Sequence, residues 1–156
     1  MYIKERNDAG LSLLEVLIVI GILGIITAVG SGIFKEFVKN TEIDSVKNKI
    51  IFDLKQAQGK AMAGDSGLVW GVYFVNSTDD YYQIFSTPTN YASASTTIQE
   101  SYYLPGQIYF SAPTSTPVEV LFQKIRGTVS GTSTIILVSS STPTSTIIVA
   151  PSGLIY

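Results

Sequence analysis

The sequence predicts an α+β protein in which one long N-terminal helix packs on a C-terminal antiparallel β domain. Three observations support this prediction. Residues 11–34 form an apolar run with Glu15 as its only ionisable side chain. Residues 35–64 are rich in charge but keep apolar side chains at helical spacing. Residues 68–156 change to period-two alternation and to β-branched and aromatic side chains.

The composition limits the function classes. A chain of 156 residues can form one domain, or one domain with an anchor. A hydrophobic share of 46%, a charged share of 14% and a mean hydropathy of +0.31 indicate contact with lipid. A net charge of −2 argues against a general nucleic-acid binder, so nucleic acid is not expected as a partner. The chain has neither Cys nor His, so we expect no enzyme, no metal site and no cofactor.

The N-terminal residues divide into a leader and an anchor. Residues 1–10, MYIKERNDAG, are polar and too short to fold, which indicates a leader peptide. Residues 11–34 are long enough for a transmembrane helix, because about 20 apolar residues cross a hydrocarbon core of roughly 30 Å. A secretory signal cleaved near Ala28-Val29-Gly30 is the alternative, and Glu15 argues against it. The flanking lysines and arginine leave the orientation open.

Glu15 is the residue of this helix that needs explaining, since an acid in an apolar helix costs at least about 2.5 kcal/mol. Cleavage after Gly10 would create an α-amine on Leu11, about 6 Å along the helix from Glu15. An ammonium and a carboxylate about 4 Å apart attract by roughly 4 kcal/mol at an effective dielectric near 20. The spacing leaves open whether the amine belongs to the same subunit or to a neighbour. The alternative is that Glu15 lies near the membrane surface and has no function.

The string Gly10-Leu11-Ser12-Leu13-Leu14-Glu15, followed by an apolar helix, resembles the class III signal of type IV pilins and pseudopilins. The resemblance implies a pilin-like fold, cleavage after Gly10 and N-methylation of Leu11 by a prepilin peptidase/methyltransferase. It also implies assembly with other pilin or pseudopilin subunits, in register through Glu15. Leu11 departs from the Phe that is commoner at this position. Many type IV pilins have a proline in the first helix, and its absence here favours a pseudopilin or minor pilin.

Small residues recur along the anchor. Gly24, Ala28 and Gly32 are spaced four apart, which lets two helices approach closely in lipid. The alternative is that membrane helices are rich in glycine in general. In both cases the segment suits dense packing of helices.

An amphipathic extension follows over residues 35–64. Its apolar stripe, at steps near 3.6 residues, is formed by Val38, Ile43, Val46, Ile50, Leu54, Ala57 and Ala61. We expect the helix to run to about Ala63 and to stop at Gly64 and Gly67.

The remaining residues, 68–156, are predicted to form a β-rich globular domain that covers the helix stripe. Expected strands are Leu68 to Val75, Tyr81 to Ser86, Ile98 to Leu104, Gln107 to Ser111, Val118 to Lys124, Thr134 to Ser139, Thr146 to Ala150 and Gly153 to Tyr156.

A second resemblance narrows the family. A helix ending in Leu54 to Ala61, a segment Phe122 to Gly127 and a closing hairpin around Gly153 are similar to the H-type pseudopilin group, which includes GspH and FimT. Gln58 stands where that helix usually has Arg. The resemblance implies a minor pseudopilin at or near a filament tip that helps to start assembly.

Three other chemistries have only weak support in the sequence. Gly64-Asp65-Ser66-Gly67 spells the tetrapeptide around a trypsin-like nucleophile, but the chain lacks the histidine that this chemistry needs. Asp79 and Asp80 supply too few oxygens for calcium. Beyond Lys60 the only cations are Lys124 and Arg126, expected on one strand face, and they make a small footprint for DNA.

The sequence thus predicts a structural subunit of a type IV pilus, type II secretion or competence filament. The resemblance places it as a single-pass protein of the cytoplasmic (inner) membrane, with its globular domain outside the cytoplasm and an inner-membrane assembly platform as a partner. Two alternatives remain: a DNA-binding minor pilin of a DNA-uptake pilus, and a monomeric membrane-anchored binding domain.

Overall fold

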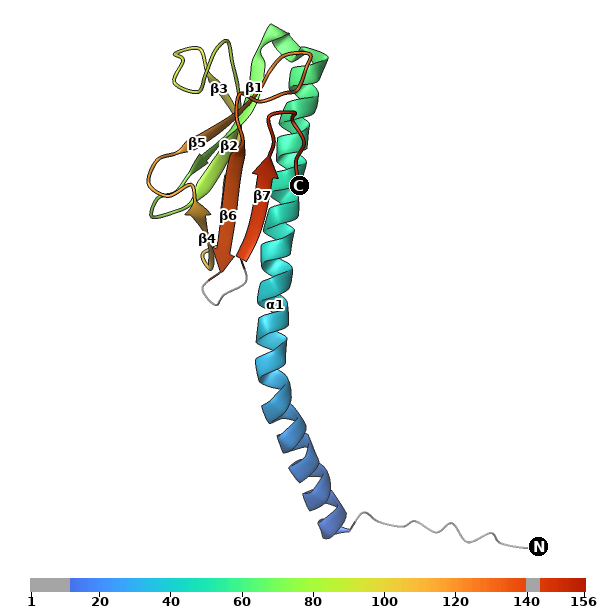
Figure 1. Ribbon diagram of the computed structural model, residues 1–156. Coiled ribbons are helices and arrows are strands. Elements are labelled where there is room, and N and C mark those ends of the chain that lie inside the picture. The colour runs from blue at the N-terminus through green and yellow to red at the C-terminus, as the bar shows by residue number, and fades with distance from the viewer. Residues whose placement is uncertain (1–11, 140–143) are drawn as a thin grey trace, which may run out of the picture. The chain divides into compact units, whose positions relative to one another are not determined.

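The computed structural model describes residues 12–139 and 144–156 (Figure 1). The predicted leader, Gly10 and Leu11 lie outside the described residues, as do the side chains of residues 29–36 and Lys39. The chain divides after Val38 into two compact units, which are described separately here.

One helix, α1, spans Leu13–Ala63. It begins after Ser12, whose side chain accepts a backbone hydrogen bond from the first turn. It ends at Gly64, which adopts the left-handed conformation (φ +67°) typical of a residue just past a helix. The prediction that this helix stops at Gly64 is confirmed, and Gly67 also has a positive φ of 64°.

The residues with described side chains contain no helix long and apolar enough to cross a membrane. The predicted span, residues 11–34, runs over residues outside that description, and it stays a prediction.

In the second unit, the C-terminal part of α1 buries one face. The predicted stripe is confirmed from Ile43 onward: Ile43, Val46, Ile50, Leu54, Ala57 and Ala61 are all at most 3% exposed. The prediction was wrong for Val38, which is 44% exposed. Burial begins at Ile43, within the unit that contains both sheets.

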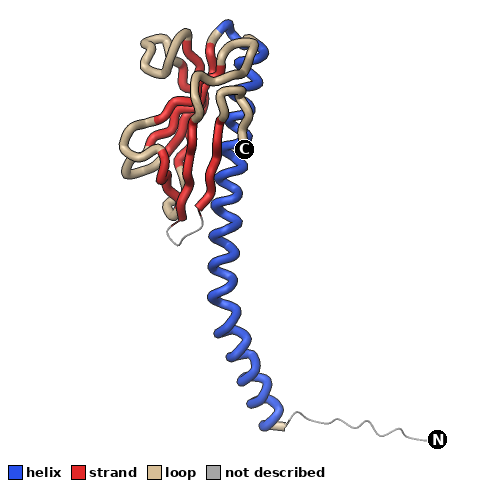
Figure 2. The backbone as a smooth tube through the Cα atoms, in the orientation of Figure 1, coloured by secondary structure: helices blue, strands red, loops and turns tan. Residues whose placement is uncertain are grey.

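Two antiparallel sheets complete this unit (Figure 2). The four-stranded sheet has the order β3-β2-β1-β5, and the three-stranded sheet has the order β4-β6-β7. The strands are β1 Val69–Val75, β2 Tyr81–Thr87, β3 Thr97–Tyr103, β4 Ile108–Ala112, β5 Val118–Phe122, β6 Ser133–Ser139 and β7 Thr144–Val149. Strand β3 is an edge, exposed at nearly every residue.

Seven of the eight predicted strands are present with small shifts at their ends. The prediction of a strand at Gly153 to Tyr156 was wrong. A turn at Pro151–Gly153 leaves only a single bridge between Val149 and Ile155. The chain end is nevertheless tied to β7, because Ile148 and Tyr156 exchange two backbone hydrogen bonds of 2.8 and 3.1 Å.

The core lies between the helix stripe and the inner faces of both sheets. Its largest fully buried side chains include Phe74, Tyr82, Phe110 and Phe122. Burying one such side chain stabilises the fold by roughly 1.5–3 kcal/mol. The predicted α+β fold, with a helix packed on antiparallel sheets, is confirmed.

Candidate functional site

The first turn of α1 carries the residue on which the functional prediction depends. The Glu15 N–H donates to Ser12 Oγ at 3.2 Å and to the Ser12 carbonyl at 3.1 Å. Ser12 is therefore the N-cap, and Glu15 is the third helical residue, where a carboxylate is favoured by the helix dipole. The capping role of Ser12 was not predicted, although the Ser-x-x-Glu spacing of a capping box could have indicated it.

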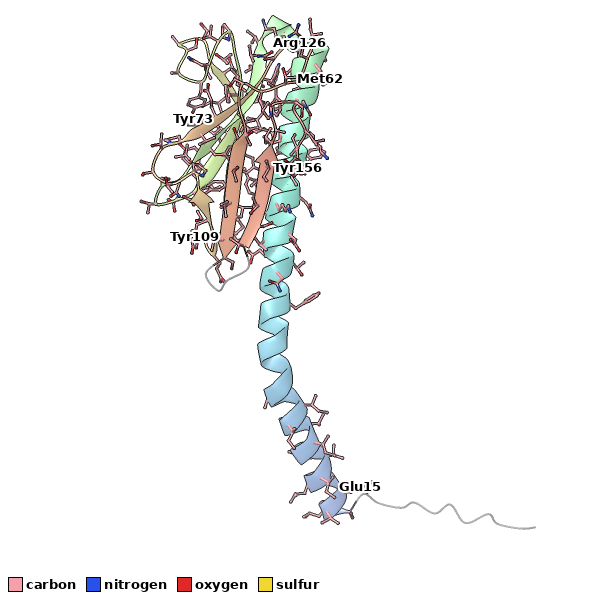
Figure 3. All side chains as sticks on the ribbon, in the orientation of Figure 1. Glu15, Met62, Tyr73, Tyr109, Arg126 and Tyr156 are labelled. Carbon is pink, nitrogen blue, oxygen red and sulfur yellow. The ribbon has the colours of Figure 1, made fainter. Side chains whose placement is uncertain are left out.

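Large apolar side chains surround this turn and extend along the helix. Leu13 is 84% exposed and Leu14 is 69% exposed, and most apolar side chains up to Ile26 are exposed to a similar degree. Figure 3 shows Glu15 at the start of this apolar segment. Exposed apolar surface of this extent marks an interaction site.

The predicted packing residues are only partly described. A Cβ added at Gly24 would meet no atom within 4 Å, so nothing within the described part of the chain requires glycine there. Ala28 is exposed on the same helix, and Gly32 lies among the residues whose side chains are not described. The helix-packing role of all three stays a prediction.

A second cluster joins three distant segments in the β unit. Gln58 Nε2 donates to the carbonyl oxygens of Gly127, at 2.9 Å, and Gly153, at 2.8 Å. Both glycines have positive φ, 63° and 84°. These are the three segments of the H-type resemblance, and the structure brings them into contact. The Gln58 contacts were not predicted, since they span 69 and 95 residues of sequence.

A third cluster surrounds a buried carboxylate. Asp53 is 1% exposed, and it accepts a hydrogen bond of 2.6 Å from the Tyr82 hydroxyl. Lys49 Nζ, on the preceding helical turn, lies 2.6 Å from Asp53 Oδ1. Burial, followed by the hydrogen bond to Asp53, raises the pKa of Tyr82 well above its ordinary value. The cluster joins helix to sheet, and sequence reasoning missed it.

The two adjacent acids Asp79 and Asp80 have different environments. Asp80 is buried, and its two carboxylate oxygens accept hydrogen bonds from the backbone N–H groups of Ser77, at 2.8 Å, and Phe110, at 2.6 Å. Asp79 is exposed in the same turn. Among the described residues there is no cluster of acids that could hold a metal ion.

The Gly64–Gly67 tetrapeptide and the pair of cations, Lys124 and Arg126, also have local structural explanations. Ser66 lies in the turn after α1 with φ 54°, and its hydroxyl donates to Asp65 Oδ1 at 3.1 Å. Lys124 and Arg126 were expected on a strand, and this was wrong. Strand β5 ends at Phe122, and both cations lie in the turn that follows, because Gly127 closes it with positive φ.

Comparison with known proteins addresses the N-terminal segment. A family model described as "Prokaryotic N-terminal methylation motif" matches residues 6–31. No curated protein and no solved structure matches the chain.

The motif and the fold define the class of protein. The chain carries the N-methylation motif, the class III signal, of type IV pilins and pseudopilins, and its α+β fold is pilin-like. It is a prepilin-like protein, and the motif implies processing by prepilin peptidase and a membrane-anchored or secreted pilin. Proteins of this pilin-like kind are typically structural subunits without enzymatic activity.

Proposed function

We propose that this chain is a structural subunit, a minor pilin or pseudopilin, of a type IV pilus, type II secretion or competence filament. The observation that carries the proposal is the methylation motif over residues 6–31, which includes the exposed apolar side chains of α1 from Leu13 to Ile26. Lipid before assembly, and neighbouring helices afterwards, would cover that apolar surface.

Processing would create the charge that Glu15 needs. Cleavage after Gly10 removes residues 1–10 and leaves an ammonium, methylated or not, on Leu11. This ammonium pairs with Glu15 of a neighbouring subunit and sets the register of the two helices. Since lipid and helices exclude water, the Coulomb attraction between the two charges is stronger there than in bulk solvent.

The remaining parts follow the same proposal. Residues 11–34 anchor the chain once through the cytoplasmic membrane, with Gly24, Ala28 and Gly32 at helix contacts. Residues 35–64 extend the helix, and residues 68–156 lie outside the cytoplasm as the globular domain. An inner-membrane assembly platform then moves the subunit into the filament.

The finer proposal is membership of the H-type pseudopilin group. Its support is the contact between Gln58, Gly127 and Gly153, which joins the three segments of that resemblance. This membership would place the subunit at or near a filament tip, where it helps to start assembly.

The proposal is tested by mass spectrometry of the mature protein, made in cells that contain the peptidase. We expect a chain that begins at methylated Leu11. An intact Met1 in such cells contradicts the proposal. Glu15→Gln is the companion variant: cleavage should continue, but filaments should be lost. Asp44→Asn, a matched change at an exposed position of the same helix, should leave filament abundance unchanged.

A DNA-binding minor pilin is the second candidate, favoured by one observation. Lys124 and Arg126 are both exposed on a single turn. Filter binding with a salt titration tests it, since contacts to phosphates give an affinity that falls with salt. A monomeric membrane-anchored binding domain, the third reading, requires an uncut leader and a replaceable Glu15.

A further inference from the structure

The turn after β5 holds both cations of the chain beyond Lys60 around one exposed apolar side chain. Lys124 and Arg126 flank Ile125, which is 77% exposed. Ile125 has φ 67°, a left-handed conformation that β-branched residues rarely adopt. Such a conformation persists where surrounding contacts fix it, and it is found most often at functional positions.

The surroundings of this turn do fix it. The Ile125 N–H donates to the Ala61 carbonyl at the end of α1 at 3.0 Å, and the Gly127 N–H donates to Gln123 O at 2.9 Å. Gln123 N–H donates to Thr128 O at 2.8 Å. The turn is therefore a preformed apolar projection between two positive charges, which loses little freedom on binding.

A cavity with a mixed polar and apolar lining, which includes the exposed carboxylate of Asp79, lies at the β1–β2 turn. It has a volume of about 320 Å³. The residues that line it are Asn76, Ser77, Thr78, Asp79, Asp80, Leu104, Gly106, Ile108 and Tyr109. Pockets for small-molecule ligands begin near 300 Å³, so this cavity is large enough to admit one side chain. Of the two acids in its lining, Asp79 is exposed, whereas Asp80 is buried and each of its carboxylate oxygens accepts a hydrogen bond from a backbone N–H group.

The projection and the cavity lie at opposite ends of the β unit. Strands β1 and β5 are antiparallel, with Trp70 opposite Phe122 and Phe74 opposite Val118. The Lys124–Arg126 turn follows Phe122, whereas the Asp79 turn follows Val75 at the other end of β1. Figure 3 shows Arg126 and Tyr109 at these two ends. A strand of seven residues separates them by roughly 20 Å.

We infer that Ile125 of one copy inserts into this cavity of the next copy, where Lys124 and Arg126 face Asp79. The inference rests on the proposed filament function. Because two different surfaces meet, the contact is heterologous, and in a filament, where the rotation between copies does not close a ring, it repeats as an open array. It requires copies that follow one another in the filament. It therefore rests on the broader proposal of a filament subunit, and its success would overturn the tip position proposed with the H-type group.

The observations favour a protein partner over DNA or a lipid surface. Beyond Lys60 the chain has two cations against five acids, which gives a nucleic acid or an anionic membrane little to bind. Arginine is enriched at the centre of protein interfaces, and Arg126 lies next to the exposed Ile125. Asp79, the acid that would pair with Lys124 and Arg126, is present on this same chain.

Cysteine cross-linking in cells tests the contact, because the native chain has no cysteine. The double variant Ile125→Cys/Thr78→Cys should form a ladder of dimers, trimers and larger species on oxidation. Each single variant should form none, and neither should the matched exposed pair Ile125→Cys/Ile98→Cys. Arg126→Cys/Asp79→Cys is a second test pair, which leaves Ile125 in place.

Charge reversal provides an independent readout. Asp79→Lys should lower the yield of the Ile125→Cys/Thr78→Cys ladder several-fold, and adding Arg126→Glu should restore it. Filaments sheared from the same cells are measured in parallel. Filaments without a ladder from either pair overturn this contact and leave the proposed function standing.

The other outcomes are equally decisive. Failure of the unmodified chain to enter filaments overturns the proposed function, and the contact with it. A cross-linked product whose mass is not a multiple of this chain assigns the turn to a different partner. Dimers from Ile125→Cys alone indicate a head-to-head contact. Both results overturn the inference.

Discussion

The hydroxyl of Tyr82, on β2, donates a 2.6 Å hydrogen bond to the carboxylate of Asp53, on α1, and both residues are almost fully buried. This bond ties the helix to the four-stranded sheet from inside the core. Lys49 neutralises the carboxylate from the exposed side, where its own side chain is 40% accessible.

Removal of the carboxylate is expected to destabilise the β unit. Asp53→Ala leaves the Tyr82 hydroxyl buried without its partner, and we expect a loss of about 2–3 kcal/mol in the free energy of unfolding. Urea unfolding of the full chain in detergent measures the loss. Asp44→Ala, on the exposed side of the same helix, should change it by less than about 0.5 kcal/mol. Equal effects of the two variants would contradict this account.

Alkaline pH should weaken the same contact. Burial and the bond to Asp53 raise the pKa of Tyr82 above its ordinary value of 10.0, so the fold favours the protonated phenol. The stabilisation is complete below pH 10 and is lost as the pH rises above it, because the unfolded chain then ionises while the folded chain resists.

The measurement for this prediction is the melting temperature between pH 9 and roughly pH 11.5, where unfolded tyrosine titrates. Tyr82→Phe should flatten the decline, although Tyr91, whose pKa desolvation also raises, keeps part of it. Tyr109→Phe, at an exposed position, should retain the slope of the unaltered chain. An unchanged slope in Tyr82→Phe would refute the assignment.

Gly153 should not tolerate a side chain. Its φ is 84°, and an added Cβ would collide with the carbonyl of Gly127 and with the amide of Gln58. We expect Gly153→Ala to cost about 2 kcal/mol or more in thermal or urea unfolding. Gly106→Ala is the matched control, since a Cβ there meets no atom within 4 Å. If both variants have the same free energy of unfolding, the crowding at Gly153 does not affect stability.

Gln58 should be replaceable only by another donor. Gln58→Leu removes the hydrogen bonds to Gly127 and Gly153 and should destabilise the chain by about 2 kcal/mol. Gln58→Glu should cost more, because a carboxylate would then face two carbonyl oxygens. Gln58→Arg supplies donors again and should be the mildest of the three. Denaturant unfolding ranks them, and a different order would exclude a donor role for this side chain.

Much of the fold could be predicted because the spacing of apolar residues along short stretches of sequence indicates helices and strands. Apolar spacing near 3.6 residues located the buried stripe from Ile43 to Ala61, and alternation located the seven strands. Local spacing failed for Lys124 and Arg126, because the chain leaves the sheet at Phe122 through a turn that depends on Gly127.

Other features depend on contacts between distant residues and could not be predicted. Alternation places Phe85 on the outer face of its sheet, yet Phe85 is fully buried. Its ring packs over Gly71 and meets Tyr91 edge-on at 5.0 Å, so the loop after β2 covers it. The N-terminal site was the opposite case. Its motif is contiguous in sequence, so Gly10, Leu11 and Glu15 could be named without any structure.

Strand β3, one of the two edge strands of the four-stranded sheet, bears on solubility. Its outer backbone groups are available for pairing with a strand of another chain. Glu100, exposed in the middle of β3, and the irregular register between Ile84 and Phe85 both disfavour such pairing. One carboxylate and one backbone irregularity thereby protect the unassembled chain against amyloid-like association.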